Sequence, residues 1–294
     1  MSIIEIWRDS PAFYLSSIFI LGLMVGSFLN VVIHRLPKMM KSRWRQECEV
    51  FLSEEDGKPL LDAQTERYNL LTPRSHCPAC GHKISALENI PIISYLVLGG
   101  RCKACKTPIA KRYPLIELVS ALLVLATAWQ FGVSGQASAA IILTWVLLTL
   151  TMIDYDHQYL PDDLTLPFLW LGLILNLYDV FTDIQSALIG AMVGYMLLWT
   201  VYQAFKLFTG KEGMGFGDFK LLAMLGAWLG WQALPAIIIL SSLVGAVVGI
   251  LLIIFRQHDK QKPIPFGPYL AAAGWIALIW GSDITRAYLN FSGL

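Results

Sequence analysis

Charged residues are scarce in this chain. Only 15% of its 294 residues are charged and 56% are hydrophobic, with a mean hydropathy of +0.58. Soluble domains carry about 25% charged residues, so this scarcity excludes an ordinary soluble globular protein. The first residues also lack a basic region and a cleavage site of small residues. We therefore expect the first apolar run to be a retained helix and not a removed signal peptide.

Two further patterns are missing from the sequence. No Gly-x-Gly-x-x-Gly follows a predicted strand, so nothing points to a nucleotide-binding fold. No convincing internal repeat is present, which disfavours a transporter built from inverted repeats. The net charge of +1 indicates no class of charged partner, and no nucleic-acid partner is expected.

Long apolar runs are what the chain has instead. A membrane span needs about 20 apolar residues, and shorter runs occur where the backbone lines a wet cavity. The predicted fold class is therefore an all-α polytopic membrane protein with about eight transmembrane helices. The runs lie at 13–33, 114–131, 138–153, 164–178, 184–205, 219–231, 234–255 and 269–288, and the sixth is the weakest.

Lysine and arginine set the expected orientation. The stretch 37–112 holds 13 of the 22 basic residues, and cytoplasmic loops carry such an excess. Eight crossings then bring 154–163, 206–218 and 256–268 to the same cytoplasmic side and leave both termini periplasmic. The expected domains are a first transmembrane helix at 1–36, a cytoplasmic four-cysteine zinc domain at 37–112 and a seven-helix membrane catalytic domain at 113–294.

Four of the five cysteines form two CxxC pairs, Cys77 with Cys80 and Cys102 with Cys105, separated by 21 residues. This spacing is typical of a tetrahedral four-cysteine zinc site, which is closed and therefore structural. The alternatives are two disulfides or free thiols, and the reducing cytoplasm disfavours disulfides. The apolar stretch NIPIISYLVLGG between the pairs is expected to lie against the membrane or a partner.

Two aspartates at the edges of apolar runs are the candidate catalytic residues. Asp154 ends one run in TMIDYDHQYLPDD, and Asp218 begins another in GMGFGDFK. A carboxylate beside hydrocarbon is costly and usually functional, and the topology returns both to one face. Two carboxylates that share a proton can activate water and polarise a peptide carbonyl. Gly215 and Gly217 leave space along the backbone for an extended substrate strand.

Structural roles for these acids remain open at this point. Asp218 could cap the helix that follows it. Asp154 could be a solvated member of an acidic loop, although the apolar LTLTMI before it makes it the deepest of the four loop carboxylates and Asp156 the next candidate. Asp162 and Asp163 follow Pro161 and are expected to begin the next helix.

Two rival functions also follow from the residues alone. In the first, the chain is a cation-coupled transporter with Asp154, Asp218 and Glu117 as relay groups. Glu117 could equally pair with Arg112 or Lys111 at the membrane interface. In the second, the chain is a redox- or metal-sensing scaffold whose cysteine loop is the active part and whose aspartates are caps.

Five elements in a fixed order resemble the type IV prepilin peptidases, also known as leader peptidases and N-methyltransferases. They cover most of the chain. The elements are GSFLNVVIHRLP at 26–37, CPAC followed by NIPIISYLVLGGRCKACKTPIAKRYPLIE, then IDYDHQYLPD, GMGFGDFK, and IPFGPYL at 264–270.

The resemblance implies a bifunctional inner-membrane enzyme active at the cytoplasmic face. It implies cleavage of the basic leader of type IV prepilins and type II secretion pseudopilins after a glycine, then methylation of the new N-terminus with S-adenosylmethionine. It assigns catalysis to Asp154 and Asp218. It assigns Zn²⁺ to the four cysteines of the CxxC pairs and links the metal to methylation and not to proteolysis. Because all four cysteines are present, a protease without methyltransferase activity is disfavoured. Expected partners are the pilin substrates and membrane lipid, with Asp156 as a further candidate substrate-binding residue and the methyl-donor site unassigned.

Overall fold

The structure is a computed structural model that describes residues 3–56, 68–256 and 265–292. Lys260 and Lys262 of the expected loop 256–268, and Ile264 of IPFGPYL, lie outside the described residues. The chain divides into two compact units, Met1–Ala128 and Trp129–Leu294, each described by itself. The α-helices are α1 Ile3–Asp9, α2 Pro11–Asp56, α3 Ile93–Val97, α4 Arg112–Phe131, α5 Gly135–His157, α6 Asp162–Asn176, α7 Ile184–Thr209, α8 Phe216–Leu229, α9 Leu234–Arg256 and α10 Gly267–Ser292.

The described residues form helices and no extended strands, so the prediction of an all-α polytopic membrane protein is confirmed. Each of the eight predicted runs lies in a helix to within two residues, but the count of eight spans is not confirmed. Within the described residues five helices are long and apolar enough to cross a membrane, namely those in α2, α4, α5, α7 and α9. The 15 residues of α6 and the 14 of α8 rise only about 21–23 Å, less than the roughly 30 Å hydrocarbon core. Helix α10 is interrupted at Trp280.

In the first unit, α2 extends far beyond the predicted end of its apolar run at residue 33. It continues through Pro37 to Asp56. The polar segment after Pro37 is rich in Lys, Arg, Met, Gln and Glu, which favour helix strongly, and contains no glycine. Hydropathy marks where the chain leaves the membrane, whereas helix propensity decides where the helix ends.

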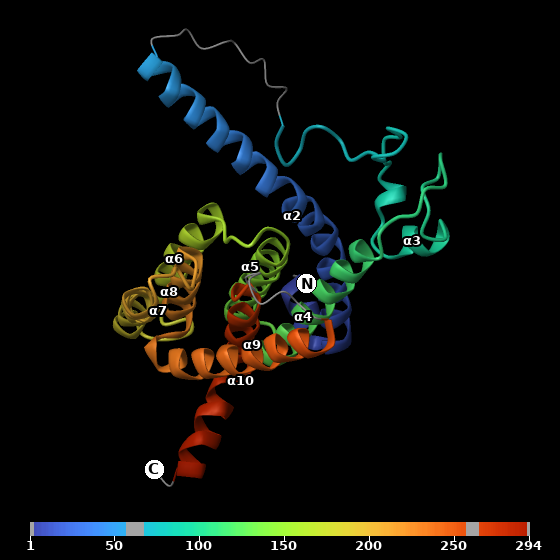
Figure 1. Cartoon of the computed structure of the whole chain (residues 1–294). Coiled ribbons are helices and arrows are strands. Elements are labelled where there is room, and N and C mark those ends of the chain that lie inside the picture. The colour runs from blue at the N-terminus through green and yellow to red at the C-terminus, as the bar shows by residue number, and fades with distance from the viewer. Residues whose placement is uncertain (1–2, 57–67, 257–264, 293–294) are drawn as a thin grey trace. The chain divides into compact units, whose positions relative to one another are not determined.

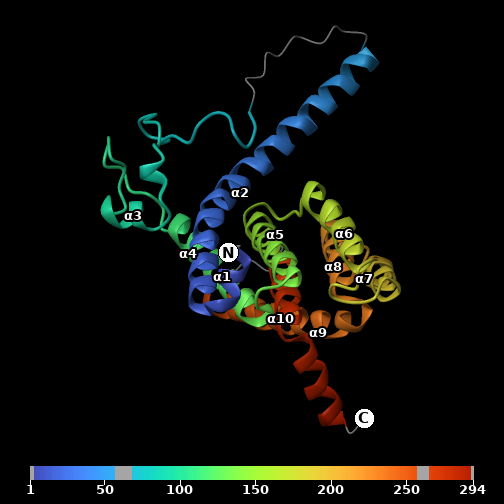
Figure 2. The ribbon, with the colours of Figure 1, turned by 180° about the vertical axis from the view of Figure 1, so that it is seen from behind.

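Small residues bring α2 and α4 into close contact, as Figures 1 and 2 both show. A Cβ added at Gly26 would lie 2.8 Å from the Cα of Glu117, and one at Gly22 would lie 2.7 Å from the Cα of Ala121. The hydroxyl of Ser120 donates to the carbonyl oxygen of Gly22 at 2.8 Å. Such pairs of small residues allow membrane helices to pack backbone against backbone.

In the second unit, α8 is a buried helix packed against α6, α7 and α10 (Figure 1). Its apolar residues cover all sides, and Phe219 and Trp228 are fully buried. Gly226 of α8 lies against the backbone of Gly190 in α7. Asn176 at the end of α6 donates to the carbonyl oxygens of Ala227 and Trp228. A short helix with apolar side chains all round is stable only when other helices enclose it, which fixes the position of α8 and of Asp218 at its start.

Candidate aspartate site and metal centre

Asp154 lies in the last turn of α5 and is buried, with 5% of its surface exposed. Helix α5 ends just beyond it, where the left-handed Gln158 donates its N–H to the carbonyl oxygen of Asp154. The side-chain carboxylate accepts a hydrogen bond from the backbone N–H of Gly267, the first residue of α10. Its Oδ2 atom is buried and has no hydrogen-bond partner among the described residues. Buried polar atoms are normally satisfied, so this oxygen points to a ligand or water in the working protein.

Asp218 lies in the first turn of α8 and is also buried. The N-cap of α8 is Gly215, not Asp218, so Asp218 is not the N-cap residue. Its carboxylate accepts a hydrogen bond from the backbone N–H of Gly215. In a capping box, the side chain of the third helical residue bonds to the N-cap residue in the same way. Asp218 therefore stabilises the start of α8 and also interacts electrostatically with Asp154.

Leu160 joins the two aspartate segments. A Cβ added at Gly217, next to Asp218, would lie 2.9 Å from the Cβ of Leu160. One added at Gly267 would lie 3.3 Å from the Cδ1 of Leu160 and 2.6 Å from the Oδ2 of Asp154. The starts of α8 and α10 and the end of α5 therefore meet at one junction, which brings the two predicted acids together.

The other predicted residues around this junction have different surroundings. Gly215 faces open space, whereas Gly217 packs against Leu160. Asp156 is exposed. Asp162, in the first turn of α6, forms an ion pair with Lys220 of α8, with Nζ to Oδ2 at 2.6 Å. This pair links α6 and α8 beside the two aspartates.

The four CxxC thiols form one cluster. Cys77 Sγ lies 3.8 Å from Cys105 Sγ, and Cys80 Sγ lies 4.0 Å from Cys102 Sγ. All four sulfur atoms lie within 4.8 Å of one another, and none is in a disulfide. Tetrahedral zinc with Zn–S bonds of about 2.3 Å requires sulfur–sulfur distances of about 3.8 Å. The cluster therefore fits a metal ion with four thiolate ligands.

The two halves of this cluster have the same local structure. In the first, Gly81 N–H donates to Cys77 O, and Cys77 N–H donates to His82 O. In the second, Lys106 N–H donates to Cys102 O, and Cys102 N–H donates to Thr107 O. Gly81 and Lys106 occupy the same left-handed position, at φ 72° and 60°. The Thr107 hydroxyl, followed by the Thr107 backbone, lowers the pKa of Cys105 to about 6. The pKa of Cys80 is raised to about 12, because the lowering by the His82 backbone is outweighed by the Cys105 side chain and by burial.

Glu88 connects the two halves across the cluster. Its carboxylate lies 3.1 Å from His82 Nε2 and 3.2 Å from Lys103 Nζ. The backbone N–H of Ser85, then the His82 side chain, lower the pKa of Glu88 to about 2. The carboxylate is therefore ionised at any physiological pH, and its contribution is lost only as pH falls through that value. No sequence signal singled out Glu88, because its partners are set by the fold of the loop.

Comparison with known proteins agrees with this arrangement. The family description "Bacterial Peptidase A24 N-terminal domain" matches residues 20–131, and "Type IV leader peptidase family" matches residues 141–250. A prepilin leader peptidase/N-methyltransferase of Pseudomonas aeruginosa is 55% identical over 100% of this chain and 99% of its own length. The chain belongs to the type IV leader peptidase family. Proteins of the same name from Aeromonas salmonicida and Stutzerimonas stutzeri are 56% and 55% identical, over 98% and 100% of both chains. No solved structure matches the chain.

The membership confirms the resemblance drawn from the five sequence elements. Sequence reasoning missed two residues of this leader peptidase's aspartate junction, Leu160 and Gly267. Each lies inside an element of the resemblance, IDYDHQYLPD and IPFGPYL respectively. The one local signal for Gly267 was its position between two prolines at the start of a helix, which does not reveal its contact with Asp154.

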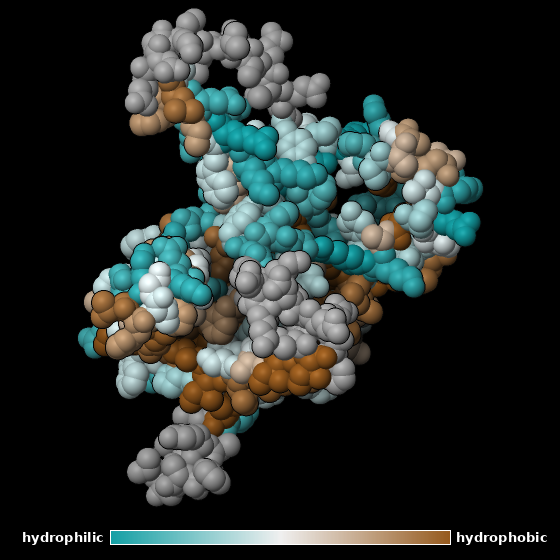
Figure 3. Space-filling view, in the orientation of Figure 1, coloured by the Kyte–Doolittle hydropathy of each residue, from teal (hydrophilic) through white to brown (hydrophobic). Residues whose placement is uncertain are grey.

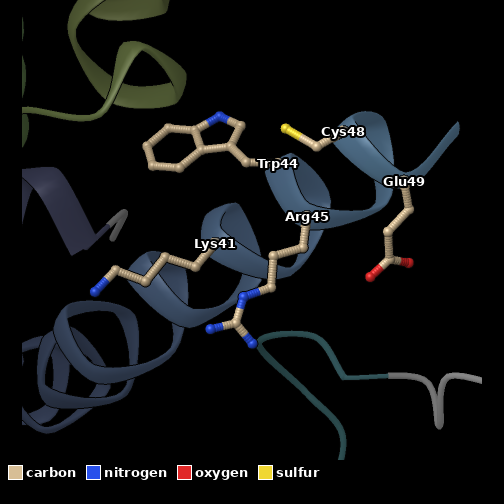
Figure 4. A pocket seen from close by; sticks show the side chains of 5 residues that line it. All are labelled: Lys41, Trp44, Arg45, Cys48 and Glu49. Atoms are coloured by element: carbon tan, nitrogen blue, oxygen red, sulfur yellow. The ribbon is translucent and has the colours of Figure 1, made fainter. Parts of the chain in front are cut away.

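A shallow hollow on α2 is a poor alternative site. It is lined by Lys41, Trp44, Arg45, Cys48 and Glu49, all on one face of this single helix (Figure 4). One helix face cannot enclose a substrate, and the hollow contains none of the predicted site residues. The surface along this outer part of α2 is largely hydrophilic (Figure 3).

Proposed function

We propose that the chain cleaves the leader peptide of type IV prepilins and type II secretion pseudopilins and then methylates the new N-terminus. The observation that carries the proposal is the junction of Asp154 and Asp218, two buried and interacting acids, one with an unsatisfied oxygen. Support comes from the full-length relatives, which carry the name prepilin leader peptidase/N-methyltransferase.

The surroundings of the two aspartates give each a role in this proposal. Each carboxylate accepts one backbone N–H at the start of a helix, Asp154 from Gly267 and Asp218 from Gly215. The Oδ2 of Asp154 has no partner among the described residues and can receive a proton from water, so we assign Asp154 as the ionised member. Its Oδ2 takes a proton from water, whose oxygen attacks the scissile carbonyl carbon. Asp218 holds the shared proton and donates it to the carbonyl oxygen, which gives a tetrahedral diol. Asp154 then passes the proton that it took from water to the amide nitrogen, the C–N bond breaks to release the amine, and the diol oxygen returns its proton to Asp218.

The cysteine cluster serves the second activity in this proposal. Cys77, Cys80, Cys102 and Cys105 hold Zn²⁺, which supplies a structural crosslink for the cytoplasmic domain at 37–112. S-adenosylmethionine supplies the methyl group for the amine that cleavage releases. Gly215, beside open space, is a contact for the substrate backbone, with Gly217 and Asp156 as its neighbours in this role. The seven-helix part at 113–294 carries the proteolysis.

The expected orientation follows from the basic residues of 37–112. The chain lies in the bacterial inner membrane, with both termini periplasmic and the aspartates at the cytoplasmic face. The exposed carboxylates Asp156, Asp162 and Asp163 then attract a basic leader to this face.

The test uses the full-length chain in proteoliposomes with a prepilin, followed by mass spectrometry. Without S-adenosylmethionine we expect cleavage of the leader alone. With it, the mature chain gains one N-terminal methyl group and the precursor gains none. An uncut precursor under both conditions contradicts the proteolytic role, and an unmethylated mature chain contradicts the methyltransferase role.

Replacement of Gly267 by alanine is expected to lower the rate of leader cleavage by about 10²-fold. The added Cβ would lie 2.6 Å from Asp154 Oδ2, so the carboxylate must move, and a displacement of about 1 Å is enough for such a loss. The measurement is the cleavage rate in proteoliposomes. Gly281→Ala in the same helix is the matched control, because an added Cβ there meets nothing within 4 Å. Equal rates for the two variants would show that Gly267 does not position Asp154.

A further inference from the structure

The short helix α3 of the cysteine domain exposes three large apolar side chains. Ile93, Leu96 and Val97 are 59%, 70% and 79% exposed, and their spacing places them on neighbouring positions of the helix. We call these three residues the α3 patch. Helix α3 is not among the helices long enough to span a membrane. Apolar patches outside the spans mark surfaces that something covers, and apolar side chains are visible among the polar ones in this part of Figure 3.

A buried carboxylate fixes the start of α3 to a membrane helix. The backbone N–H of Ile92, the residue before α3, donates to Glu117 Oε2 at 2.8 Å. Glu117 is 8% exposed and also accepts from the Ser27 side chain of α2. One carboxylate therefore ties α2, α4 and the start of α3 together.

This tether sets the height of α3 relative to the bilayer. Helix α4 begins at Arg112 and is long and apolar enough to cross the membrane. Glu117 lies five residues further on, roughly 7 Å along the helix axis. The start of α3 is therefore level with the first turns of a membrane helix, at the boundary between headgroups and acyl chains.

The backbone conformation of Ile92 is further evidence that the hydrogen bond to Glu117 fixes the start of α3. Its φ of 58° and ψ of −49° lie outside the left-handed helical region, in a conformation that β-branched residues avoid. The unfavourable conformation turns the chain so that the N–H faces Glu117 and α3 begins at once. Strained conformations persist where the surrounding structure holds them, and here the hydrogen bond to Glu117 does so.

The charges of the same domain match a lipid surface. Exposed basic residues of this domain, which suit anionic headgroups, include Lys83, Arg101, Lys103, Lys106 and Lys111. We propose that the α3 patch inserts into the headgroup–acyl boundary of the bilayer that α4 crosses, so that lipid covers this surface. Apolar residues with basic neighbours at this height are the pattern of an interfacial anchor. The proposal concerns membrane contact and does not depend on the activities proposed above.

The test places a photo-crosslinking benzophenone amino acid at position 96 of the full-length chain. The chain is reconstituted in vesicles that contain anionic phospholipid and is irradiated. Mass spectrometry should then find adducts with lipid acyl chains. Position 71 is the matched control, because Leu71 is 81% exposed in the same domain.

Leu71 is expected to lie well outside the bilayer. Its neighbours Asn69 and Leu70 are held by Arg35 through their carbonyl oxygens. Gly26 of α2 lies against Glu117 and so marks the height of the start of α3. Arg35 follows Gly26 by nine residues, which places it roughly 13 Å further along the axis of α2. We expect the acyl-chain adduct yield at position 71 to be about tenfold lower than at position 96.

Glu117 variants test the tether with the probe kept at position 96. Glu117→Ala removes the acceptor and should lower the lipid adduct yield several-fold, whereas Glu117→Gln keeps an acceptor oxygen and should preserve it. Metal content of both variants confirms that the cysteine domain is folded. Equal yields at positions 71 and 96 would overturn the proposal. So would adducts at position 96 with a second copy of the chain or with a prepilin in place of lipid, or a yield that Glu117→Ala leaves unchanged.

Discussion

Asparagine in place of Asp154 or Asp218 is expected to lower the rate of leader cleavage by about 10⁴-fold. Proton transfer by a positioned side chain contributes about 10²–10⁴-fold, and each aspartate in the proposed mechanism needs the other. The measurement is the initial rate of leader removal from a prepilin in proteoliposomes. The double variant should be no slower than either single variant, because the two groups act as one unit.

Two controls separate catalysis from folding for these variants. Asp156→Asn changes an exposed carboxylate two residues away and should have a small effect. Methylation of an already cleaved pilin should persist in both asparagine variants, since the cysteine cluster lies in another part of the chain. If Asp154→Asn or Asp218→Asn cleaved at the normal rate, that residue would not belong to the catalytic pair. The role left for Asp218 would then be its hydrogen bond to Gly215 at the start of α8.

Serine at both Cys77 and Cys80 is expected to abolish methylation and to leave cleavage close to wild type. Two of the four proposed metal ligands are lost, and structural zinc sites contribute their binding free energy to folding, about 10–16 kcal/mol in small zinc domains. The measurements are zinc content, cleavage and N-terminal methylation of the same preparation. Cys48→Ser is the control, because Cys48 is exposed on α2 outside the cluster.

The result for cleavage decides between two arrangements of the enzyme. Loss of both activities in the double serine variant would mean that the metal also supports the aspartate junction. Full methylation without bound metal would show that the cluster is not required for methyl transfer. Removal of the metal by a chelator from the wild-type chain should reproduce the behaviour of the serine variant.

The sequence predicted the helices and the cysteine cluster well, because both leave local patterns. Apolar runs mark membrane helices wherever they lie in the chain, and two CxxC pairs each carry their own turn. The end of α2 was not predicted, since its outer half is polar and only helix propensity favours it. The short buried α8 was the weakest prediction for a similar reason, because its stability depends on the helices that enclose it.

Contacts between distant segments could not be predicted in the same way. The hydrogen bond from Gly267 to Asp154 joins the first residue of the last helix to a much earlier one, and neither residue signals the other. The bond from Ile92 to Glu117 likewise depends on an isoleucine with a positive φ, which no propensity favours. The sequence did indicate that Asp154 and Glu117 were unusual, because an acid in an apolar run requires a compensating partner.

Asp154 depends on α10 for the hydrogen bond that its carboxylate accepts, and α10 is synthesised after α5 and α8. Ribosomes deliver α5 and α8 before α10, so a nascent chain carries both aspartates before Gly267 exists. Until α10 has been inserted, Asp154 lacks the N–H that holds it, and the junction with Leu160 is incomplete. Under the proposed mechanism, a nascent chain that lacks α10 is therefore an inactive protease, and the order of the helices delays hydrolysis until α10 is in place.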